Sequence, residues 1–390
     1  MNQCKGDCEV TFENANGIFV KKGYSILNEF SLICNNYKAE FSELESVAQV
    51  NNWINKKTNK KIPSFLPNDY DITNVNLMLV NAIYFKGSWL NGFDEKTEKR
   101  DFKNFDGVKI QVDTMKHLFK DIYYYEDEKI QMISLPYQST NLIYKMVIIL
   151  PRDNKYSSSY DYLNKENVNF TKLISKLKKV DRVQLYLPKF EFDYNIQLNE
   201  VLKKMGMEKP FSSEEANFSK ISKSKLFIDD ILHQSKITVD QNGTVAVAIT
   251  TFEIHEFSNN PNEIKELYYM YVNHSFIFLI TSDSIKDSDY NNLIIFLGTV
   301  NNLNLTKSEN NLNLNNDKGN NNNNDNNDKG NNYNNDKGNN DNNEQVVPKI
   351  HEMQFLGDRS LNKSENENGG KGVYSIKVYS LSLMFLIIML

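Results

Sequence analysis

The chain has little cysteine, little proline and no excess of charge of one sign. Its 390 residues include three cysteines and eight prolines, and 45 basic residues stand against 50 acidic ones. Three cysteines are too few for a disulfide scaffold, which a chain of this length does not need. Binding to nucleic acid requires a strongly basic face, and the charge balance indicates none. We therefore expect no nucleic-acid partner.

The motifs of common enzyme classes are also missing. The sequence has no G-x-S-x-G elbow, no phosphate-binding loop and no G-x-G-x-x-G run. His255 and His351 are each followed by Glu, but neither has the second His that a zinc-protease helix requires. Cys4 and Cys8 have no partner at zinc-site spacing. We predict no metal site, no cofactor and no enzymatic activity, and a hydrolase is the remote alternative.

The composition changes near residue 301. From about residue 301 to 343 asparagine dominates, and the heptamer NNDKGNN recurs unevenly, starting at Asn315, Asn326 and Asn334. Uneven gaps argue against a stacked repeat. Almost nothing in this composition can be buried to offset the entropy of ordering the chain. Residues 304–367 are therefore predicted to be a disordered stalk.

The C-terminal end is apolar. Residues 380–390 read SLSLMFLIIML, which is too short to span a bilayer as a helix. Three small residues at 368–370 and a spacer at 371–379 precede this run, in the pattern of a glycolipid (GPI) attachment signal. We predict that residues 368–390 are such a signal, with the lipid on Asn368. A tail-anchored helix is the alternative.

A glycolipid anchor requires entry into the secretory pathway. The first residues, MNQCKGDCEVTFENANG, contain no apolar segment that could act as a signal peptide. Either the tail is not an attachment signal, or the true start lies upstream of Met1. We favour the second explanation, and with it an extracellular or cell-surface protein.

Residues 10–303 are predicted to fold as one domain, and residues 1–9 are unassigned. Runs rich in β-branched and aromatic residues predict strands at 76–84, 142–150, 182–187, 236–249 and 292–300. Helical spacing of apolar residues occurs at 41–56 and 198–207. Because strands and helices do not alternate regularly, an α+β fold with large mixed sheets is favoured over a doubly wound fold.

The run after Gly243 has two different faces when it is extended, because alternate residues of a strand share a face. One face carries only small residues, namely Thr244, Ala246, Ala248 and Thr250. The other carries the branched residues Val245, Val247 and Ile249. A face of small residues suits a strand that slides over a packed core without overpacking it. An ordinary central strand that enters a polar loop at 251–265 is the alternative.

A series of motifs in this region resembles the serpin family. The motifs are NAIYFKGSW at 81–89, VDTM at 112–115, LPY at 135–137, MVIILP at 146–151, LYLPKF at 185–190, NHSFIF at 273–278 and FLGTV at 296–300. The resemblance covers roughly residues 10–303. It implies an α+β serpin fold, which in the full family has three sheets and about nine helices. The family's first helices are absent here, since the sequence begins near a central strand at 12–20.

The resemblance implies a serine-type endopeptidase inhibitor that acts as a suicide substrate. In inhibitory serpins a protease cleaves the reactive-centre loop and forms an acyl-enzyme, and the cleaved loop then inserts into the main sheet as a new strand. The hinge of that loop would be Gly243, Thr244, Ala246, Ala248 and Thr250. A non-inhibitory or degenerate serpin, acting as a carrier, chaperone or interaction module, is the alternative.

The family's usual spacing places the reactive-centre residue at Phe257 and the next residue at Ser258. Phe257 suits a chymotrypsin-like or cathepsin-like target with a deep apolar pocket. The stretch at 258–273 looks longer than usual, so cleavage after Lys265 by a trypsin-like protease is the alternative.

The resemblance also assigns residues that control opening of the main sheet. Trp89, Lys189 and Gln241 match the breach, where the loop first enters the sheet, and Asn81 and His233 match the shutter cluster. The family usually has glutamate where this chain has Gln241, so a hydrogen bond between Gln241 and Lys189 is expected in place of an ion pair.

Two expectations concern association and glycosylation. The branched face of the hinge raises its β-propensity, so we expect a monomer that forms loop–sheet polymers on mild heating. Asn242 begins the sequon Asn-Gly-Thr, and a glycan there would obstruct insertion. We expect that site to be empty if the protein inhibits.

Overall fold

The computed structural model describes residues 10–36, 38–63, 65–140, 142–244, 266–284, 293–303 and 349–350. The helices are α1 (Asn28–Asn36), α2 (Val47–Lys57), α3 (Ser159–Glu166), α4 (Phe170–Ile174) and α5 (Asn199–Lys204), with a 3-10 turn at Lys209–Phe211. In this part of the chain no helix has the length and apolar character needed to cross a membrane.

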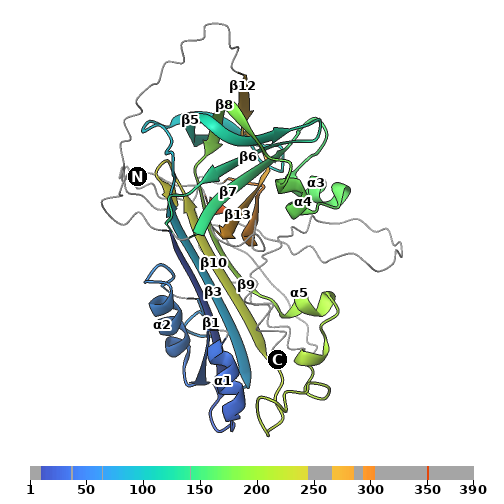
Figure 1. Cartoon of the computed structure of the whole chain (residues 1–390). Helices are drawn as coiled ribbons and strands as arrows, with labels where there is room; N and C mark the ends of the chain where they lie inside the picture. The colour runs from blue at the N-terminus through green and yellow to red at the C-terminus, as the bar shows by residue number, and fades with distance from the viewer. Residues whose placement is uncertain are drawn as a thin grey trace, which may run out of the picture.

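Seven strands form a mixed sheet whose long members run side by side in Figure 1. The order from edge to edge is β15 (Lys349–Ile350), β9 (Phe190–Gln197), β10 (Asp230–Val239), β3 (Leu77–Ser88), β1 (Thr11–Lys21) and β2 (Ala39–Leu44), and β11 (Gly243–Thr244) pairs separately with β3. Strand β3 is antiparallel to β1 and parallel to β10. It is the most deeply buried strand of this sheet.

The second sheet has eight strands. Its order is β12 (Leu267–Tyr271), β8 (Lys178–Pro188), β5 (Lys109–Glu126), β6 (Ile130–Pro136), β7 (Leu142–Pro151), β13 (Phe276–Ser284) and β14 (Leu293–Val300), and β4 (Glu98–Lys103) pairs with β5. Strand β5 has 18 residues and pairs in turn with β4, β8 and β6. Because β5 is continuous, the described residues form two hydrogen-bonded sheets where the resemblance implies three.

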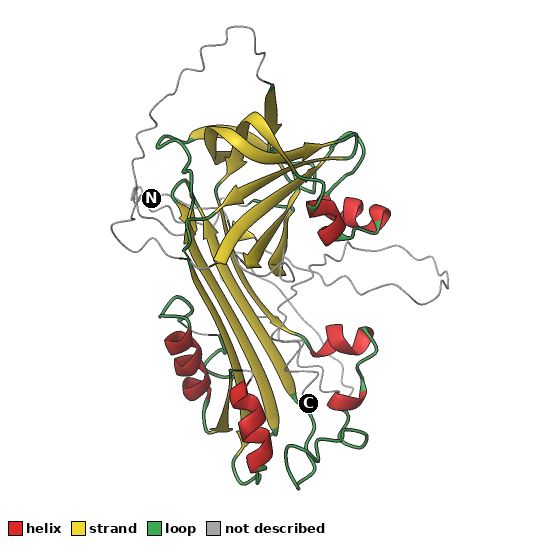
Figure 2. Ribbon diagram, in the orientation of Figure 1, coloured by secondary structure: helices red, strands yellow, loops and turns green. Residues whose placement is uncertain are grey.

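Apolar side chains cover both faces of the seven-stranded sheet. Leu77 and Leu79 pack in a cluster that includes residues of α1, and Met78 and Val80 pack in another that includes residues of α2. This alternation follows from the period of two along a strand. A third cluster joins the end of β3, at Phe85, to the eight-stranded sheet. Figure 2 shows α1 and α2 beside the long strands and α3 and α4 beside the other sheet.

The secondary-structure predictions are confirmed with corrections at particular boundaries. All five predicted strands form, but a turn at 240–242 divides the strand expected at 236–249 into β10 and β11, and its residues 245–249 lie outside the described residues. The helix expected from residue 41 begins at Val47, because Phe41 and Leu44 belong to β2 and Ser46 caps α2. The helix expected at 198–207 is shorter, Asn199–Lys204. The α+β class is confirmed.

Candidate functional site

The chain reverses direction at the end of β10 and returns to the sheet. A two-residue turn joins Asp240 to Gly243, with backbone hydrogen bonds in both directions between them (2.9 and 3.2 Å). Asn242 closes the turn, because its amide donates to the Asp240 carboxylate at 2.9 Å. After the turn, β11 pairs antiparallel with the end of β3, so that Gly243 faces Ser88 and Thr244 faces Gly87. The first two residues of the predicted hinge are therefore already strand residues.

Gly243 is required by the backbone at this turn. Its φ of +139° lies in a region that L-residues rarely adopt. A Cβ atom there would lie 2.2 Å from the carbonyl oxygen of Gly87 and 2.6 Å from the Cα of Ser88. Both contacts are with backbone, which cannot rotate away as a side chain can. Any other residue would therefore push β11 off β3.

Trp89 binds the turn at 240–243, which is the base of the predicted loop. Its indole Nε1 donates to the carbonyl of Asp240 at 3.0 Å, and its backbone amide donates to the carbonyl of Asn242 at 3.2 Å. The indole stacks on Tyr137 with ring centroids 4.5 Å apart. The amide of Phe93 donates to the carbonyl of Gln241 at 3.1 Å. The segment after β3 thus binds each of the three residues that follow β10.

The expected hydrogen bond, in which Lys189 would donate to the side-chain oxygen of Gln241, is not formed. The side-chain oxygen of Gln241 is buried and accepts no hydrogen bond within the described part of the chain. Lys189 is buried as well, and its charge acts on Asp240 instead. Burial raises the pKa of the Asp240 carboxyl, and the Asn242 amide and the Lys189 charge oppose that rise. The turn brings the backbone of Gln241, rather than its side chain, into the contact network.

Below this point β3 and β10 pair directly. Their parallel register runs from Met78 opposite Asp230 to Tyr84 opposite Lys236; we call this pairing the β3–β10 seam. Beyond Tyr84 the described partner of β3 on this side is β11. An additional strand that continued from β11 along β3 would have to separate the seam.

Asn81 and His233 face each other inside the seam. The His233 Nδ1 lies 2.7 Å from the Asn81 Oδ1, and the Asn81 Nδ2 donates to the side chains of Asn16 (2.9 Å) and Asn14 (3.0 Å) on β1. Asn81 and His233 are almost fully buried. Burial lowers the pKa of His233 to about 4, so the imidazole is neutral at pH 7. Its Nε2 has no partner among the described residues.

Several of these contacts involve residues that no sequence motif marked. Asn14 and Asn16 were given no role, although two asparagines two residues apart in a predicted strand share a face. Tyr137 stood in a quoted motif without a function. Asp240 offered no signal in sequence, because its contacts arise from the turn that follows it.

The other predicted site residues lie outside the described part of the chain. They are Ala246, Ala248 and Thr250 of the hinge, Phe257 and Ser258 at the reactive centre, the alternative residue Lys265, and Asn368. Their roles remain predictions.

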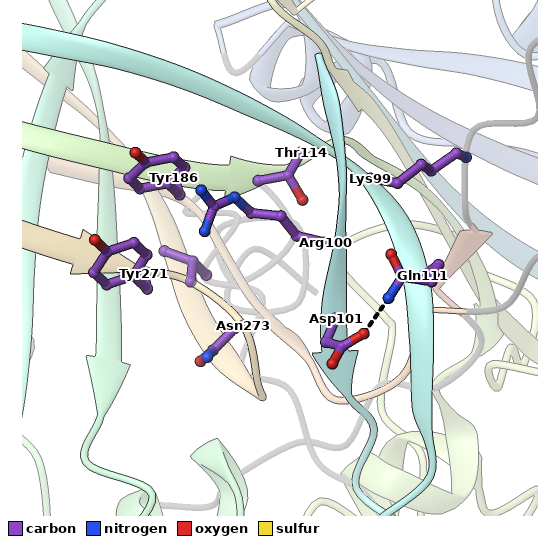
Figure 3. Close-up of a pocket in the computed structure, with 9 residues that line it drawn as sticks. Lys99, Arg100, Asp101, Gln111, Thr114, Tyr186, Tyr271 and Asn273 are labelled. Atoms are coloured by element: carbon purple, nitrogen blue, oxygen red, sulfur yellow. Dashed lines mark hydrogen bonds between the residues drawn. The ribbon is translucent and has the colours of Figure 1, made fainter.

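A cavity of about 360 Å³ lies on the eight-stranded sheet. Figure 3 shows Arg100 over the ring of Tyr186, at 3.9 Å from its centroid, with Tyr271 stacked beside it. The cations at this cavity are paired, Arg100 with Glu98 and Lys99 with Asp113. None of the predicted site residues lines it. The described residues also contain no group of acidic, histidine or cysteine side chains that could hold a metal ion.

Comparison with known proteins agrees with this geometry. The family model described as serpin (serine protease inhibitor) matches residues 2–303. An uncharacterized serpin-like protein of Methanosarcina acetivorans is 33% identical over 65% of this chain and 61% of its own length, and Iripin-8 of Ixodes ricinus is 32% identical over 76% and 73%. The chain therefore spans less than two thirds of the first of these relatives.

Solved structures show the same fold. The native thermophilic serpin Tengpin superposes with a TM-score of 0.65 at 29% identity, covering 76% of this chain and 74% of Tengpin. Serpin48 of the insect Tenebrio molitor superposes with a TM-score of 0.61 at 27% identity, covering 77% and 78%. The family model, the relatives and the fold agree, and the chain belongs to the serpin family.

Proposed function

We propose that this protein inhibits a serine-type endopeptidase as a suicide substrate. Serpin family members are generally inhibitors rather than catalytic enzymes. The observation that carries the proposal is the pairing of β11 with β3: the chain leaving β10 has already turned back and begun an extra strand at the open end of the β3–β10 seam. An inserted strand needs only to extend this pairing.

The proposed reaction begins at the loop. The target's nucleophile attacks the carbonyl carbon of Phe257, the peptide bond to Ser258 breaks, and Ser258 leaves as a new amino terminus. The protease is then held as an ester on Phe257. Residues 244–257 insert along β3 as a strand about 46 Å long, which carries the protease to the far end of the sheet. New backbone hydrogen bonds and burial of the loop drive this step.

Two groups of described residues would take part in insertion, one at the base of the loop and one in the β3–β10 seam. Trp89 and Gly243 hold the base of the loop against the end of β3, where insertion starts. Asn81 and His233 lie in the seam that must open. Ala246, Ala248 and Thr250 would present their small side chains to the face over which the strand moves.

The predicted surroundings belong to the same proposal. The target is chymotrypsin-like or cathepsin-like if Phe257 is cleaved, and trypsin-like if cleavage follows Lys265. The serpin family includes extracellular members, and we propose that this protein is one of them. It would be held at the cell surface by a glycolipid on Asn368, at the end of the asparagine-rich stalk.

Incubation of the full chain with chymotrypsin tests the proposal. A complex that survives a denaturing gel is expected, because the ester on Phe257 is trapped before hydrolysis. Gly243→Ala should convert the inhibitor into a cleaved substrate, since the added Cβ meets backbone at 2.2 Å. Gly107→Ala is the matched control, because Gly107 also has a positive φ but the added Cβ would have no atom of the described residues within 4 Å.

Two other outcomes would sink the proposal. Clean cleavage of the wild-type loop without a covalent complex, by chymotrypsin and by trypsin, would identify a non-inhibitory serpin. The buried oxygen of Gln241, which has no hydrogen-bond partner among the described residues, favours this second candidate, because the breach loses one contact. Continued turnover of a substrate by the protein itself would identify a hydrolase.

A further inference from the structure

We propose that Tyr70, Asp229 and Asp230 form a clamp that keeps the far end of the β3–β10 seam closed and limits the rate at which an inserted strand reaches full depth. The inference deepens the proposed function and rests on it. It concerns the end of β3 opposite to β11, where no site residue was predicted from the sequence.

The clamp joins β10 to its neighbours through one carboxylate. The hydroxyl of Tyr70 donates to the Asp230 Oδ2 at 2.6 Å, and the side-chain amide of Gln197 on β9 donates to the other oxygen. Tyr70 belongs to the segment at 65–76, which runs from α2 into β3. Separation of β3 from β10 would therefore pull Tyr70 away from Asp230.

Asp229 makes a second connection at the same end. Its Oδ2 accepts hydrogen bonds from the backbone amides of Asn76 (2.6 Å) and Leu77 (3.1 Å), where β3 begins. Its own amide donates to the carbonyl of Leu77 at 3.0 Å. The entry to β10 thus holds the entry to β3 through three hydrogen bonds in addition to the strand register.

The segment that carries Tyr70 is itself fixed. The side chain of Asn51 on α2 accepts from the amides of Phe65 and Leu66 and donates to the carbonyl of Leu66, each at 2.9 Å. Tyr70 also packs against the core cluster under α2. Because the segment is tied to α2, Tyr70 cannot follow β10 when the strands separate.

The two carboxylates depend on these donors, since neither forms an ion pair in the described part of the chain. Burial raises the pKa of Asp230, the Tyr70 and Gln197 donors oppose the rise, and the charge of Asp229 adds to it. Burial likewise raises the pKa of Asp229, against the Asn76 and Leu77 amides and the charge of Lys21. Opening the clamp leaves a buried carboxylate with fewer donors, which is unfavourable.

The register of β11 shows when an inserted strand would meet the clamp. Gly243 faces Ser88 and Thr244 faces Gly87. Continued one residue at a time, this register brings residue 253 opposite Met78, which is the present partner of Asp230. Met78 lies ten residues from Ser88, about 33 Å along the strand. Early insertion therefore leaves the clamp intact, and full insertion must break it.

Uptake of a synthetic peptide with the sequence of residues 244–257 by the full chain tests this inference without a protease. The rate is followed by the mobility shift on a native gel. Tyr70→Phe removes one hydrogen bond to a carboxylate, so uptake should be roughly three- to tenfold faster. Asp230→Asn should also accelerate peptide uptake. The double variant should take up the peptide no faster than the faster of the two single variants.

Tyr125→Phe is the matched control. The Tyr125 hydroxyl also donates to an aspartate, the Asp127 Oδ2 at 2.9 Å, but it lies on β5 in the eight-stranded sheet, away from the β3–β10 seam. It should take up the peptide at the wild-type rate. Equal rates for Tyr70→Phe and Tyr125→Phe would overturn the clamp, even if Tyr70→Phe lowers the melting temperature.

Measurements on the wild-type chain distinguish failure of the clamp from failure of the proposed inhibition. If it forms the covalent complex with chymotrypsin while Tyr70→Phe and Asp230→Asn take up peptide at the control rate, the clamp alone is wrong. If no variant takes up the peptide, the inserting strand and the clamp are both wrong.

Discussion

The indole of Trp89 donates a hydrogen bond to the backbone carbonyl of Asp240 at 3.0 Å. The residue that follows β3 thereby fixes the residue that follows β10, although 151 positions separate them in the sequence. The two strands that would part during the proposed insertion are therefore joined by a hydrogen bond at the end of the β3–β10 seam. The same contact sets the starting position of the loop.

Replacing this indole should destabilise the protein and loosen the loop. Trp89→Phe removes the hydrogen bond and part of the stacking on Tyr137, and we expect a loss of about 2 kcal/mol in the free energy of unfolding. Trp53→Phe is the control, because the half-buried Trp53 indole also donates to an oxygen, that of Glu40 at 2.7 Å, but this hydrogen bond is exposed. Urea titration measures both. Equal losses in the two variants would contradict a special role for Trp89.

Acid should destabilise the protein through His233. The pKa of this buried histidine is lowered to about 4, against an ordinary value of 6.5. Between those values the unfolded chain binds a proton that the folded chain does not. The stability that comes from keeping His233 neutral is therefore fully present above pH 6.5. As the pH falls towards 4 the free energy of unfolding decreases by about 3 kcal/mol in all.

The variant His233→Gln isolates that effect. Glutamine can still donate to the Asn81 oxygen but does not titrate, so the free energy of unfolding should fall less steeply between pH 6.5 and 4. Burial also lowers the pKa of His274. The variant His274→Gln therefore shows how much of the pH dependence of the free energy of unfolding comes from the other buried histidine. The same slope in wild type and His233→Gln would show that His233 does not titrate as described.

The asparagines of β1 should support the seam unequally. Asn16 is 4% exposed and accepts from Asn81 at 2.9 Å, whereas Asn14 is only partly buried. Asn16→Ala leaves a buried donor on Asn81 with one acceptor fewer, and we expect a loss of about 1–3 kcal/mol. Asn14→Ala should cost less. Thermal unfolding of the two variants compares them, and a larger loss in Asn14→Ala would contradict the burial argument.

Loop–sheet polymers are expected on mild heating. The apolar face of Val245, Val247 and Ile249 favours strand pairing with another molecule. A ladder on a native gel is the predicted result, and Val247→Thr should weaken it. A wild-type sample that remains monomeric after heating would be evidence against the prediction.

The fold class, the positions of five strands and the family could be predicted from the sequence, because they depend on hydrophobic periodicity and on short ordered motifs. It failed where a contact depends on a turn. Gln241 was expected to reach Lys189 with its side chain, but the turn at 240–242 presents its backbone carbonyl to Phe93 instead. Phe41 and Leu44 have helical spacing, yet Ser46 starts α2 after them.

The clamp illustrates a second limit of sequence reasoning. Tyr70 and Asp230 are separated by 160 positions, and neither stands in a motif. An adjacent pair of aspartates before an apolar run usually indicates a solvated turn. Only the packing of the segment at 65–76 across the start of β10 makes their hydrogen bond and burial apparent.

The close approach of Gly243 to the backbone of Gly87 and Ser88 has a genetic consequence. Every amino acid that a single-base change can introduce at a glycine codon carries a Cβ atom. All missense alleles at this position should therefore share one defect at the loop base, whatever the chemistry of the new side chain. Natural variation at this codon would consequently test whether selection maintains the proposed inhibition.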